Sequence, residues 1–289
     1  MSLTPLDKAA LKRQFDRAAT SYDSHAVLQR EIESRLLERI AFQRADPEVI
    51  LDLGCGTANA TRELQARYPQ SSVFSLDWSM PMLEKTGQSQ CAGGLTPFCA
   101  DMHALPLGPA TINLVFSNLA LQWSYDLPAI FRELRRVMKA DAMLVFSCYG
   151  PDTLTELKQS WRRVDDRQHV NDFPDMHDIG DELLAAGFRE PVMDVERLTL
   201  QYPDVISLMR ELQGLGESNA ATDRFRGLTA RGSLDGVLEA YERFRDNGRY
   251  PASFEVIYGT AFAPAEGQPM KTPEGDVATF SVDALRRRS

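Results

Sequence analysis

A short apolar segment that runs directly into a glycine-rich turn constrains the fold of this chain more than any other feature. The apolar segment is Val49–Leu53, the turn is Gly54-Cys-Gly-Thr57, and a helical pattern follows from Asn59. Gly54 permits a tight turn, and Gly56 lets a ligand approach the backbone at a point where a Cβ atom would clash. Because the first turn of a helix leaves backbone N–H groups unpaired, the combination predicts a ligand-binding turn at the end of a strand.

Short apolar runs alternate with amphipathic stretches throughout the region that this turn belongs to. Strands are predicted at Val49–Leu53, Ser72–Leu76, Thr96–Cys99, Thr111–Phe116 and Ala142–Cys148. Helices are predicted between them at Asn59–Tyr68, Ser79–Thr86 and Leu127–Lys139. This alternation favours βαβ units, and therefore an α/β fold with a mostly parallel sheet and helices on both faces.

The flanking regions are predicted to be largely helical. An N-cap at Thr4 with Pro5 in the first turn predicts one helix, and a second is predicted at Val27–Gln43 after a polar turn at Ala19–His25. Beyond Gly150 we predict helices at Thr153–Val164, Asp175–Ala186, Val205–Leu215 and Leu234–Arg245, and strands at Val192–Leu200 and Phe254–Phe262. The chain is thus divided into an N-terminal helical lid (1–45), a core (46–150), substrate-facing helices with the remaining strands (151–262) and a loop-rich tail (263–289).

Two aspartates indicate what the turn binds. Asp52 lies one residue before the end of its strand, where a carboxylate would repel a pyrophosphate but attract an amino group or another cation. Asp77 ends the next strand, 21 residues after Gly56, and a carboxylate there can accept both hydroxyls of a ribose. Alternatively, Asp77 only caps the helix that follows. The third glycine of a dinucleotide fingerprint is absent, because Ala58 stands near its position. The turn and the two acids together therefore predict an adenosine-type ligand rather than a dinucleotide.

Composition narrows the functional class. The net charge of -9 argues against nucleic-acid binding, and no apolar stretch is long enough to span a bilayer. The N-terminus has no apolar signal core, which favours a cytoplasmic protein. The four cysteines contain no C-x-x-C pair, so no zinc site is predicted from them. Histidine spacing gives no metal site either. The 26 arginines against 6 lysines reflect either composition bias or a use of arginine for forked contacts to carboxylate or phosphate.

The core motifs resemble those of class I S-adenosylmethionine-dependent methyltransferases. The resemblance lies in Leu51–Thr57, in Asp77, in Ala100-Asp-Met102 and in Phe116-Ser-Asn118. It implies a Rossmann-like, mostly parallel seven-stranded sheet, S-adenosylmethionine as cofactor and S-adenosylhomocysteine as product. The resemblance implies that Gly54 and Gly56 contact the methionine part of the cofactor and that Asp52 lies near its ammonium group. It also implies that Asp77 binds the ribose and that Asp101 binds the adenine amino group. Asn118 is expected near the methionine amine or the sulfonium. Trp78 and Met102 are expected to bind the cofactor beside these acids.

Longer segments, most of them outside the core, resemble the malonyl-acyl-carrier-protein O-methyltransferases of biotin synthesis. They are Phe15–Tyr22, His25–Gln29, Ser117–Trp123 and Leu208–Gly216. That resemblance implies methylation of the free carboxylate of a malonyl thioester on acyl carrier protein. Two alternatives stay open. Gly150–Leu157 and Leu212–Asn219 also resemble an arginine-modifying assembly factor of mitochondrial respiratory complex I, and the chain could instead be a methyltransferase-like scaffold without catalysis.

Substrate-side residues are harder to assign. Tyr22, His25 and Trp123 are candidates for orienting the acceptor, although core aromatics and a helix cap are the simpler interpretation. An acidic enzyme that meets an acidic carrier protein needs local positive charge. We therefore expect docking arginines between Gly150 and Ala252, against the alternative of solvated helix faces. The candidates are Arg210, Arg226 and Arg231, together with Arg162, Arg163 and Arg224.

Overall fold

A seven-stranded sheet forms the centre of the computed structural model. The structure describes residues 4–41, 46–87, 95–225, 227, 230–265, 270–272 and 275–277. The sheet order is β3-β2-β1-β4-β5-β7-β6, and β7 runs in the direction opposite to the other six strands. Its strands are β1 (Val49–Leu53), β2 (Ser72–Asp77), β3 (Leu95–Cys99), β4 (Ile112–Asn118), β5 (Met138–Tyr149), β6 (Arg189–Tyr202) and β7 (Tyr250–Phe262). Strand order reverses between β1 and β4, the position where open α/β sheets bind ligands beyond their carboxyl ends.

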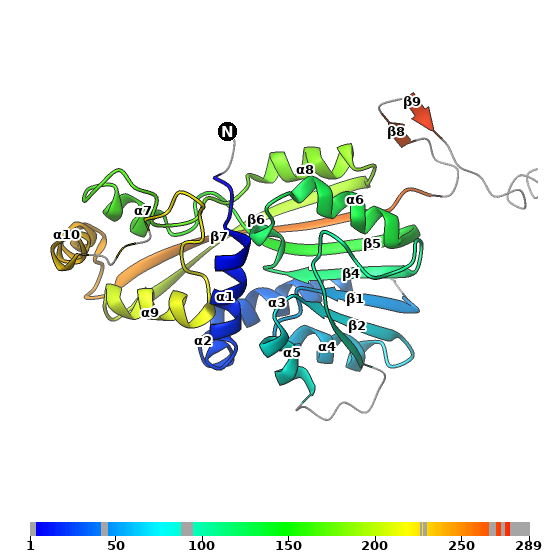
Figure 1. Cartoon of the computed structure of the whole chain (residues 1–289), viewed down its shortest axis with the longest axis horizontal. Coiled ribbons are helices and arrows are strands. Elements are labelled where there is room, and N and C mark those ends of the chain that lie inside the picture. Colours follow the sequence, from blue (N-terminus) through cyan, green and yellow to red (C-terminus); the bar gives the residue numbers. More distant parts are fainter. Residues whose placement is uncertain are drawn as a thin grey trace, which may run out of the picture.

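Helices cover both faces of the sheet because its central strands are apolar on both sides (Figure 1). Along β1, Ile50 belongs to the hydrophobic cluster of one face and Leu51 to that of the other. The first face carries α3 (Val27–Ala41) and α4 (Asn59–Arg67), and the second carries α6 (Leu127–Val137) and α8 (Met176–Ala185). The helix α5 (Met80–Gly87) connects β2 and β3. The predicted α/β fold with a mostly parallel sheet is confirmed.

The N-terminal helices lie beside helices from the second half of the chain (Figure 1). The helices α1 (Lys8–Ala18) and α2 (Tyr22–His25) contact α9 (Val205–Leu215), and α1 also contacts α5. The helix α7 (Thr155–Trp161) packs on α10 (Arg231–Tyr241). This places α1 and α2 between the sheet's first half and the inserted helices. Two short 3-10 helices, η1 (Leu121–Trp123) and η2 (Glu242–Phe244), complete the helical elements that the structure describes.

Several local predictions are corrected. The first helix is capped by Asp7, whose side chain accepts the N–H of Ala10 at 3.0 Å, rather than by Thr4, because the backbone of Pro5–Asp7 pairs with that of 220–222. The polar turn contains a one-turn helix, α2. The tail forms a small antiparallel pair, β8 (Met270–Thr272) and β9 (Gly275–Val277), where a loop is predicted; residues 266–269, 273–274 and 278–289 lie outside the described part.

Candidate cofactor and substrate site

Two adjoining cavities open at the carboxyl ends of β1, β2 and β4. They share Tyr22, Gly54, Gly56 and Asn118 in their walls. The first cavity encloses about 670 Å³ and the second about 630 Å³, each including its part open to solvent. Cavities of this size accept a small molecule. The first is further lined by Phe15, Leu76, Asp77, Trp78, Met82, Ala100, Asp101, Met102, His103, Leu119, Ala120 and Trp123, and the second by Asp23, Ala26, Gln29, Arg30, Glu33, Asp52, Cys55, Thr57, Asn59, Ala60 and Arg62.

The glycine turn forms the floor common to both cavities. Gly54 and Gly56 have φ of +74° and +53°, in the left-handed region that favours glycine. A Cβ on Gly54 would lie 2.3 Å from the Cβ of Ala120, so no side chain fits there. The N–H groups of Gly54 and Cys55 both donate to the carbonyl of Leu76, at 2.8 and 2.9 Å. The turn is therefore tied to the end of β2 and leaves its outer surface open to a ligand.

Asp77 is held by backbone donors and faces the first cavity. Its carboxylate accepts the N–H of Gly56 at 3.0 Å and that of Ser79 at 2.8 Å. Burial raises the pKa of Asp77 to about 6, although these hydrogen bonds oppose the rise. The bond to Ser79 lies before the first residue of α5, Met80, so it is not a helix cap, and the same carboxylate lines the cavity. Each oxygen accepts one N–H and keeps acceptor capacity for a further donor.

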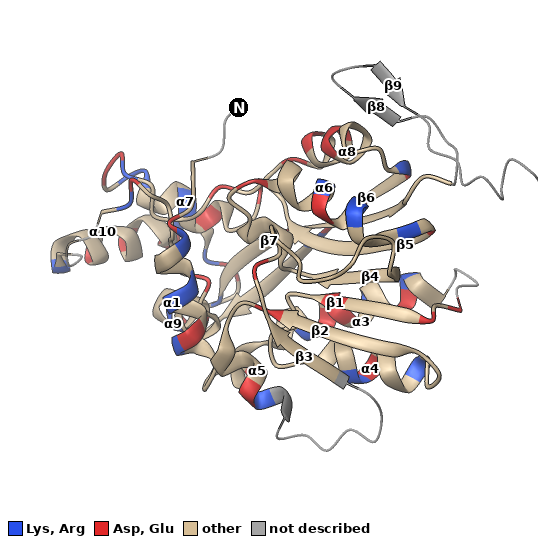
Figure 2. Ribbon diagram, turned by 45° about the vertical axis from the view of Figure 1, so that its right-hand side comes forward, with Lys and Arg blue, Asp and Glu red and all other residues tan. Residues whose placement is uncertain are grey.

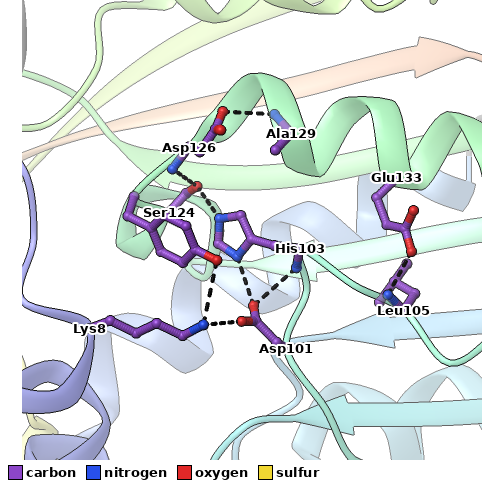
Figure 3. Close-up of polar contacts among 9 residues, drawn as sticks. Lys8, Asp101, His103, Leu105, Ser124, Asp126, Ala129 and Glu133 are labelled. Carbon is purple, nitrogen blue, oxygen red and sulfur yellow. Dashed lines mark hydrogen bonds and ion pairs between the residues drawn. The ribbon is translucent and has the colours of Figure 1, made fainter.

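A polar network fixes Asp101 at the far end of the first cavity (Figure 3). Lys8 of α1 forms an ion pair with Asp101, and His103 donates its backbone N–H to it at 3.0 Å. The His103 ring bonds Asp101 at 2.7 Å through Nδ1 and Ser124 at 3.0 Å through Nε2, and it stacks on Tyr125. Burial alone would raise the pKa of Asp101, but the hydrogen bonds from Lys8 and His103 outweigh it and lower the pKa to about 2. This carboxylate is therefore ionised.

The second cavity is lined by the acids Asp23, Glu33 and Asp52 and by the arginines Arg30 and Arg62. Asp52 is buried and accepts the hydroxyl of Thr61, while Glu33 of α3 accepts the amide of Asn59. Burial raises the pKa of each carboxyl to about 7, and the charge of Glu33 adds to the effect on Asp52. Two acids with raised pKa values in one cavity would be stabilised in their ionised forms by a bound cation. The geometry therefore suits an ammonium group.

Asn118 and Tyr22 lie where the two cavities meet. The Asn118 amide donates to the backbone carbonyl of Gln29 at 3.1 Å and accepts the Ser147 hydroxyl at 2.7 Å, so its orientation is fixed. The Tyr22 ring would contact a Cβ on Gly56 at 3.9 Å. Burial raises the pKa of Tyr22 above its usual range, so the phenol is protonated at neutral pH. Both residues can contact a ligand that spans the cavities.

The other two aromatic candidates differ from each other. Trp123 lines the first cavity and is also a core residue, because it packs edge-on against Phe15 at 5.6 Å and Phe173 at 6.0 Å. The His25 ring lies against Gly214 of α9 and bonds the carbonyl of Ser21 at 2.8 Å. It lines neither cavity. Its contacts are those of a residue that joins α2 to α9.

The arginine candidates are spread over the inserted region. Arg210 on α9 and Arg231 at the start of α10 are exposed, as are Arg162 and Arg163 after α7. Arg224 donates to Asp7 at 3.1 Å and so connects the inserted region to the N-terminus of α1. Arg226 lies outside the described residues. Among the candidates that the structure describes, Arg162 and Arg210 line different cavities.

Two site residues on α3 are missing from the sequence predictions. Gln29 and Glu33 are buried in a helix whose other buried residues are all apolar. They are one helical turn apart, so they share a face. Two polar residues in an otherwise apolar stripe are the signal that could have identified them, since buried polar groups need partners. Phe15 and Met82 give no such signal, because apolar residues at helical spacing are ordinarily interpreted as residues of the hydrophobic core.

The described residues contain no group of three or more His, Cys, Asp or Glu side chains arranged to hold a metal ion. None of the helices within the described ranges is both long and apolar enough for a bilayer.

The fold and the cavities define a class I methyltransferase. Residues 51–146 match the family model described as "Methyltransferase domain". The YcgJ protein of Bacillus subtilis superimposes with a TM-score of 0.56 at 17% identity, over 79% of this chain and 97% of that one. Phosphoethanolamine N-methyltransferase 2 of Haemonchus contortus, solved in complex with S-adenosyl-L-methionine, gives 0.53 at 15% identity, over 86% of this chain and 57% of that one. At these identities the likeness establishes the fold alone.

Sequence comparison is more specific. A malonyl-[acyl-carrier protein] O-methyltransferase of Gallionella capsiferriformans is 47% identical over 268 residues, 90% of this chain and 92% of its own. The protein of the same name from a Methylovorus species is 48% identical over 266 residues, 90% of each chain. The chain therefore belongs to the malonyl-[acyl-carrier protein] O-methyltransferase family.

Proposed function

We propose that this protein transfers the methyl group of S-adenosylmethionine to the free carboxylate of a malonyl thioester on acyl carrier protein, forming the methyl ester early in biotin synthesis. Support comes from the names of the relatives that are similar over nearly the whole chain. The observation that carries the proposal within the molecule is the pair of cavities joined at the glycine turn. We expect the reaction in the cytoplasm, on the grounds of sequence given above.

The residues present fit S-adenosylmethionine. Its ammonium group would be held in the second cavity by Asp52 and Glu33, two carboxyls whose pKa values are raised mainly by burial and whose ionised forms a bound cation would favour. Its ribose would be held by Asp77 and its adenine amino group by the ionised Asp101. The left-handed Gly54 and Gly56 leave the space between these acids free of side chains. When bound, this cofactor supplies an electrophilic methyl group on a sulfonium.

The acceptor needs no general base. A free carboxyl has a pKa near 4, so a malonyl carboxylate is already a nucleophile at neutral pH. The protein's task is to place one carboxylate oxygen in line with the methyl group, and positioning of this kind can lower the barrier by several kcal/mol. Because opposite charges cancel during transfer, a dry and weakly polar site favours the transition state. Tyr22, which stays protonated, and the largely buried Trp123 provide such surroundings beside Asn118.

A comparison of acceptors tests this function. The purified protein and S-adenosylmethionine would be incubated with malonyl carrier protein, malonyl coenzyme A or an arginine-bearing protein, and methyl transfer would be measured. We expect the highest kcat/KM with malonyl carrier protein. Transfer to the arginine-bearing protein alone would favour the arginine-modifying alternative. Binding of S-adenosylmethionine, measured by calorimetry, without transfer to any acceptor would favour a non-catalytic scaffold.

A further inference from the structure

A third cavity lies between α1 and α9, outside the cofactor site. It encloses about 910 Å³, including its part open to solvent. One wall is formed by the end of α1 and the residue before α2, and the other by the second half of α9 and Ser218. The lining consists of Gln14, Arg17, Ala18, Ser21, Arg210, Gln213, Gly214 and Ser218.

The charge of this third cavity is positive. Arg17 and Arg210 contribute guanidinium groups from opposite walls, and no carboxylate lines the space. Both arginines are exposed, and within the described ranges neither forms an ion pair with a carboxylate. Hydroxyl and amide side chains complete the lining. Figure 2 shows basic positions along α1, together with an acidic one. Two forked donors in a chain of net charge -9 mark a local site for an anion, and phosphate suits the arginine fork.

A fourth cavity adjoins this site. It shares Ser218 with the third cavity and encloses about 550 Å³ between α7 and α9. Its walls are mostly apolar, with Leu157 and Trp161 from α7 and Leu212 from α9, and Glu217 lies on its polar side. An elongated, uncharged chain that follows an anionic group could therefore occupy it.

A hydrogen bond joins a residue that lines the fourth cavity to a residue that lines the second. Gln29, which lines the second cavity, donates its side-chain amide to Glu217 at 3.1 Å and to the Tyr149 hydroxyl at 3.3 Å. The amide oxygen of Gln29 is buried and accepts no hydrogen bond from the described residues. A buried acceptor without a donor is unusual, and an amide N–H of an entering ligand would satisfy it. The arginine-lined cavity thus adjoins the fourth cavity at Ser218, and the Gln29–Glu217 hydrogen bond places the fourth cavity next to the second.

We propose that Arg17 and Arg210 bind the phosphate of the phosphopantetheine arm that carries the malonyl thioester, and that the cavity between α7 and α9 receives the arm. The inference rests on the proposed function and assigns the arm's location within it. The phosphate pairs with the two guanidiniums at the mouth. The uncharged remainder of the arm lies along the apolar wall, and Gln29 and Glu217 separate as its malonyl end reaches the cofactor.

Two small thioesters test the assignment. Malonyl-pantetheine lacks the phosphate and malonyl-4′-phosphopantetheine contains it, so the ratio of their kcat/KM values isolates the phosphate contact. We expect the wild-type protein to favour the phosphorylated thioester by about tenfold, which corresponds to about 1.4 kcal/mol, the size of one charge-assisted hydrogen bond. The double variant Arg17→Ala, Arg210→Ala should bring the ratio close to one. The matched control is Arg13→Ala, Arg249→Ala, two exposed arginines that do not line the cavity, and it should keep the wild-type ratio.

Malonyl carrier protein is the third substrate in the same assay. A wild-type protein that shows no preference for the phosphorylated thioester, or a double variant that keeps it, would overturn the phosphate site while leaving the proposed function intact. An equal loss in the control variant would show a general effect of charge and would also overturn it. If the wild-type protein methylates none of the three substrates, the proposed function fails, and the assignment of the arm fails with it.

Discussion

At the scale of single residues, the protonation of Asp52 and Glu33 is expected to make cofactor binding depend on pH. Both carboxyls have pKa values raised to about 7 because the second cavity buries them. Below pH 7 they are largely neutral, whereas an ammonium group in the cavity favours their ionised forms. Ligand binding below pH 7 must therefore release protons, and binding above it need not.

The affinity for S-adenosylmethionine is thus expected to fall as the pH is lowered from about 7 to about 5.5. Each released proton weakens binding by at most about 1.4 kcal/mol per pH unit. Calorimetry at pH 6 in two buffers of different ionisation enthalpy counts the released protons, and Asp52→Asn should reduce that count. Binding at pH 6 without any proton release would contradict the assignment of this cavity to the ammonium group.

Asp77 is expected to bind the ribose hydroxyls. Asp77→Ala should weaken S-adenosylmethionine binding by roughly 1.5–3 kcal/mol, the range for hydrogen bonds to a charged group. Part of this loss reflects the turn, since Asp77 also accepts the N–H groups of Gly56 and Ser79. Asp77→Asn, which keeps acceptor capacity but no charge, should lose less. Cofactor affinity that stays unchanged in the alanine variant, with the fold intact by circular dichroism, would remove the assignment.

At the scale of elements, we expect α1 and α2 to cover the cofactor site. Phe15 of α1 and Tyr22 of α2 line the first cavity, and α1 is attached at one end by the contacts of Lys8 with Asp101 and of Asp7 with Arg224. Exposed and partly exposed ion pairs of this kind contribute little to stability individually, about 0–1 kcal/mol each. Attachments this weak are consistent with the expectation that α1 and α2 open for the cofactor and close over it.

Hydrogen exchange measures this cover directly. Bound S-adenosylmethionine should contact Phe15 and Tyr22, so it should slow amide exchange in residues 8–25. The helix α8, packed on β6 and α6 away from the cavities, should show little change and serves as the internal control. Equal slowing in both regions, or none in residues 8–25, would be inconsistent with a lid.

The sequence predicts best those elements whose residue pattern depends only on neighbours along the chain. The strand and turn at Val49–Thr57 were predicted correctly because apolar residues, glycines and a helix start follow each other directly. The N-cap at Thr4 was wrong because Pro5–Asp7 pair with residues more than 200 positions away. The strand β6 extends to Arg189–Tyr202 because its whole length pairs with β7, which no local pattern shows. Glu33 entered the site through packing between α3 and α4, contacts that only the fold creates.

At the scale of the whole molecule, the proposed function requires this acidic protein to bind an acidic carrier protein. The chain has a net charge of -9, with acidic and basic residues interspersed along most of the ribbon (Figure 2). Long-range repulsion from an acidic carrier protein must be offset by positive charge near the contact surface, whose influence decays over about 10 Å at 0.1 M salt. The exposed Arg231 on α10 and Arg226, outside the described residues, remain the candidates for contact with the protein part of the substrate.

Charge reversal tests this docking hypothesis. Arg226→Glu and Arg231→Glu should each raise the KM for malonyl carrier protein, and added salt should weaken the wild-type protein more than either variant. Turnover of malonyl-pantetheine should change much less, because that substrate does not reach the docking surface. Carrier-protein kinetics and salt dependence that stay untouched in both variants would exclude these arginines and favour the arginine-modifying alternative.

The mass of the carrier protein after reaction tests the central claim most directly. Malonyl carrier protein and acetyl carrier protein differ in the free carboxylate, so they form a matched pair of acceptors. After incubation with this protein and S-adenosylmethionine, the malonyl form should gain the mass of one methyl group as an alkali-labile ester, and the acetyl form should gain nothing. Methylation of both forms, or of neither while an arginine side chain is modified instead, would contradict carboxylate methylation as the function.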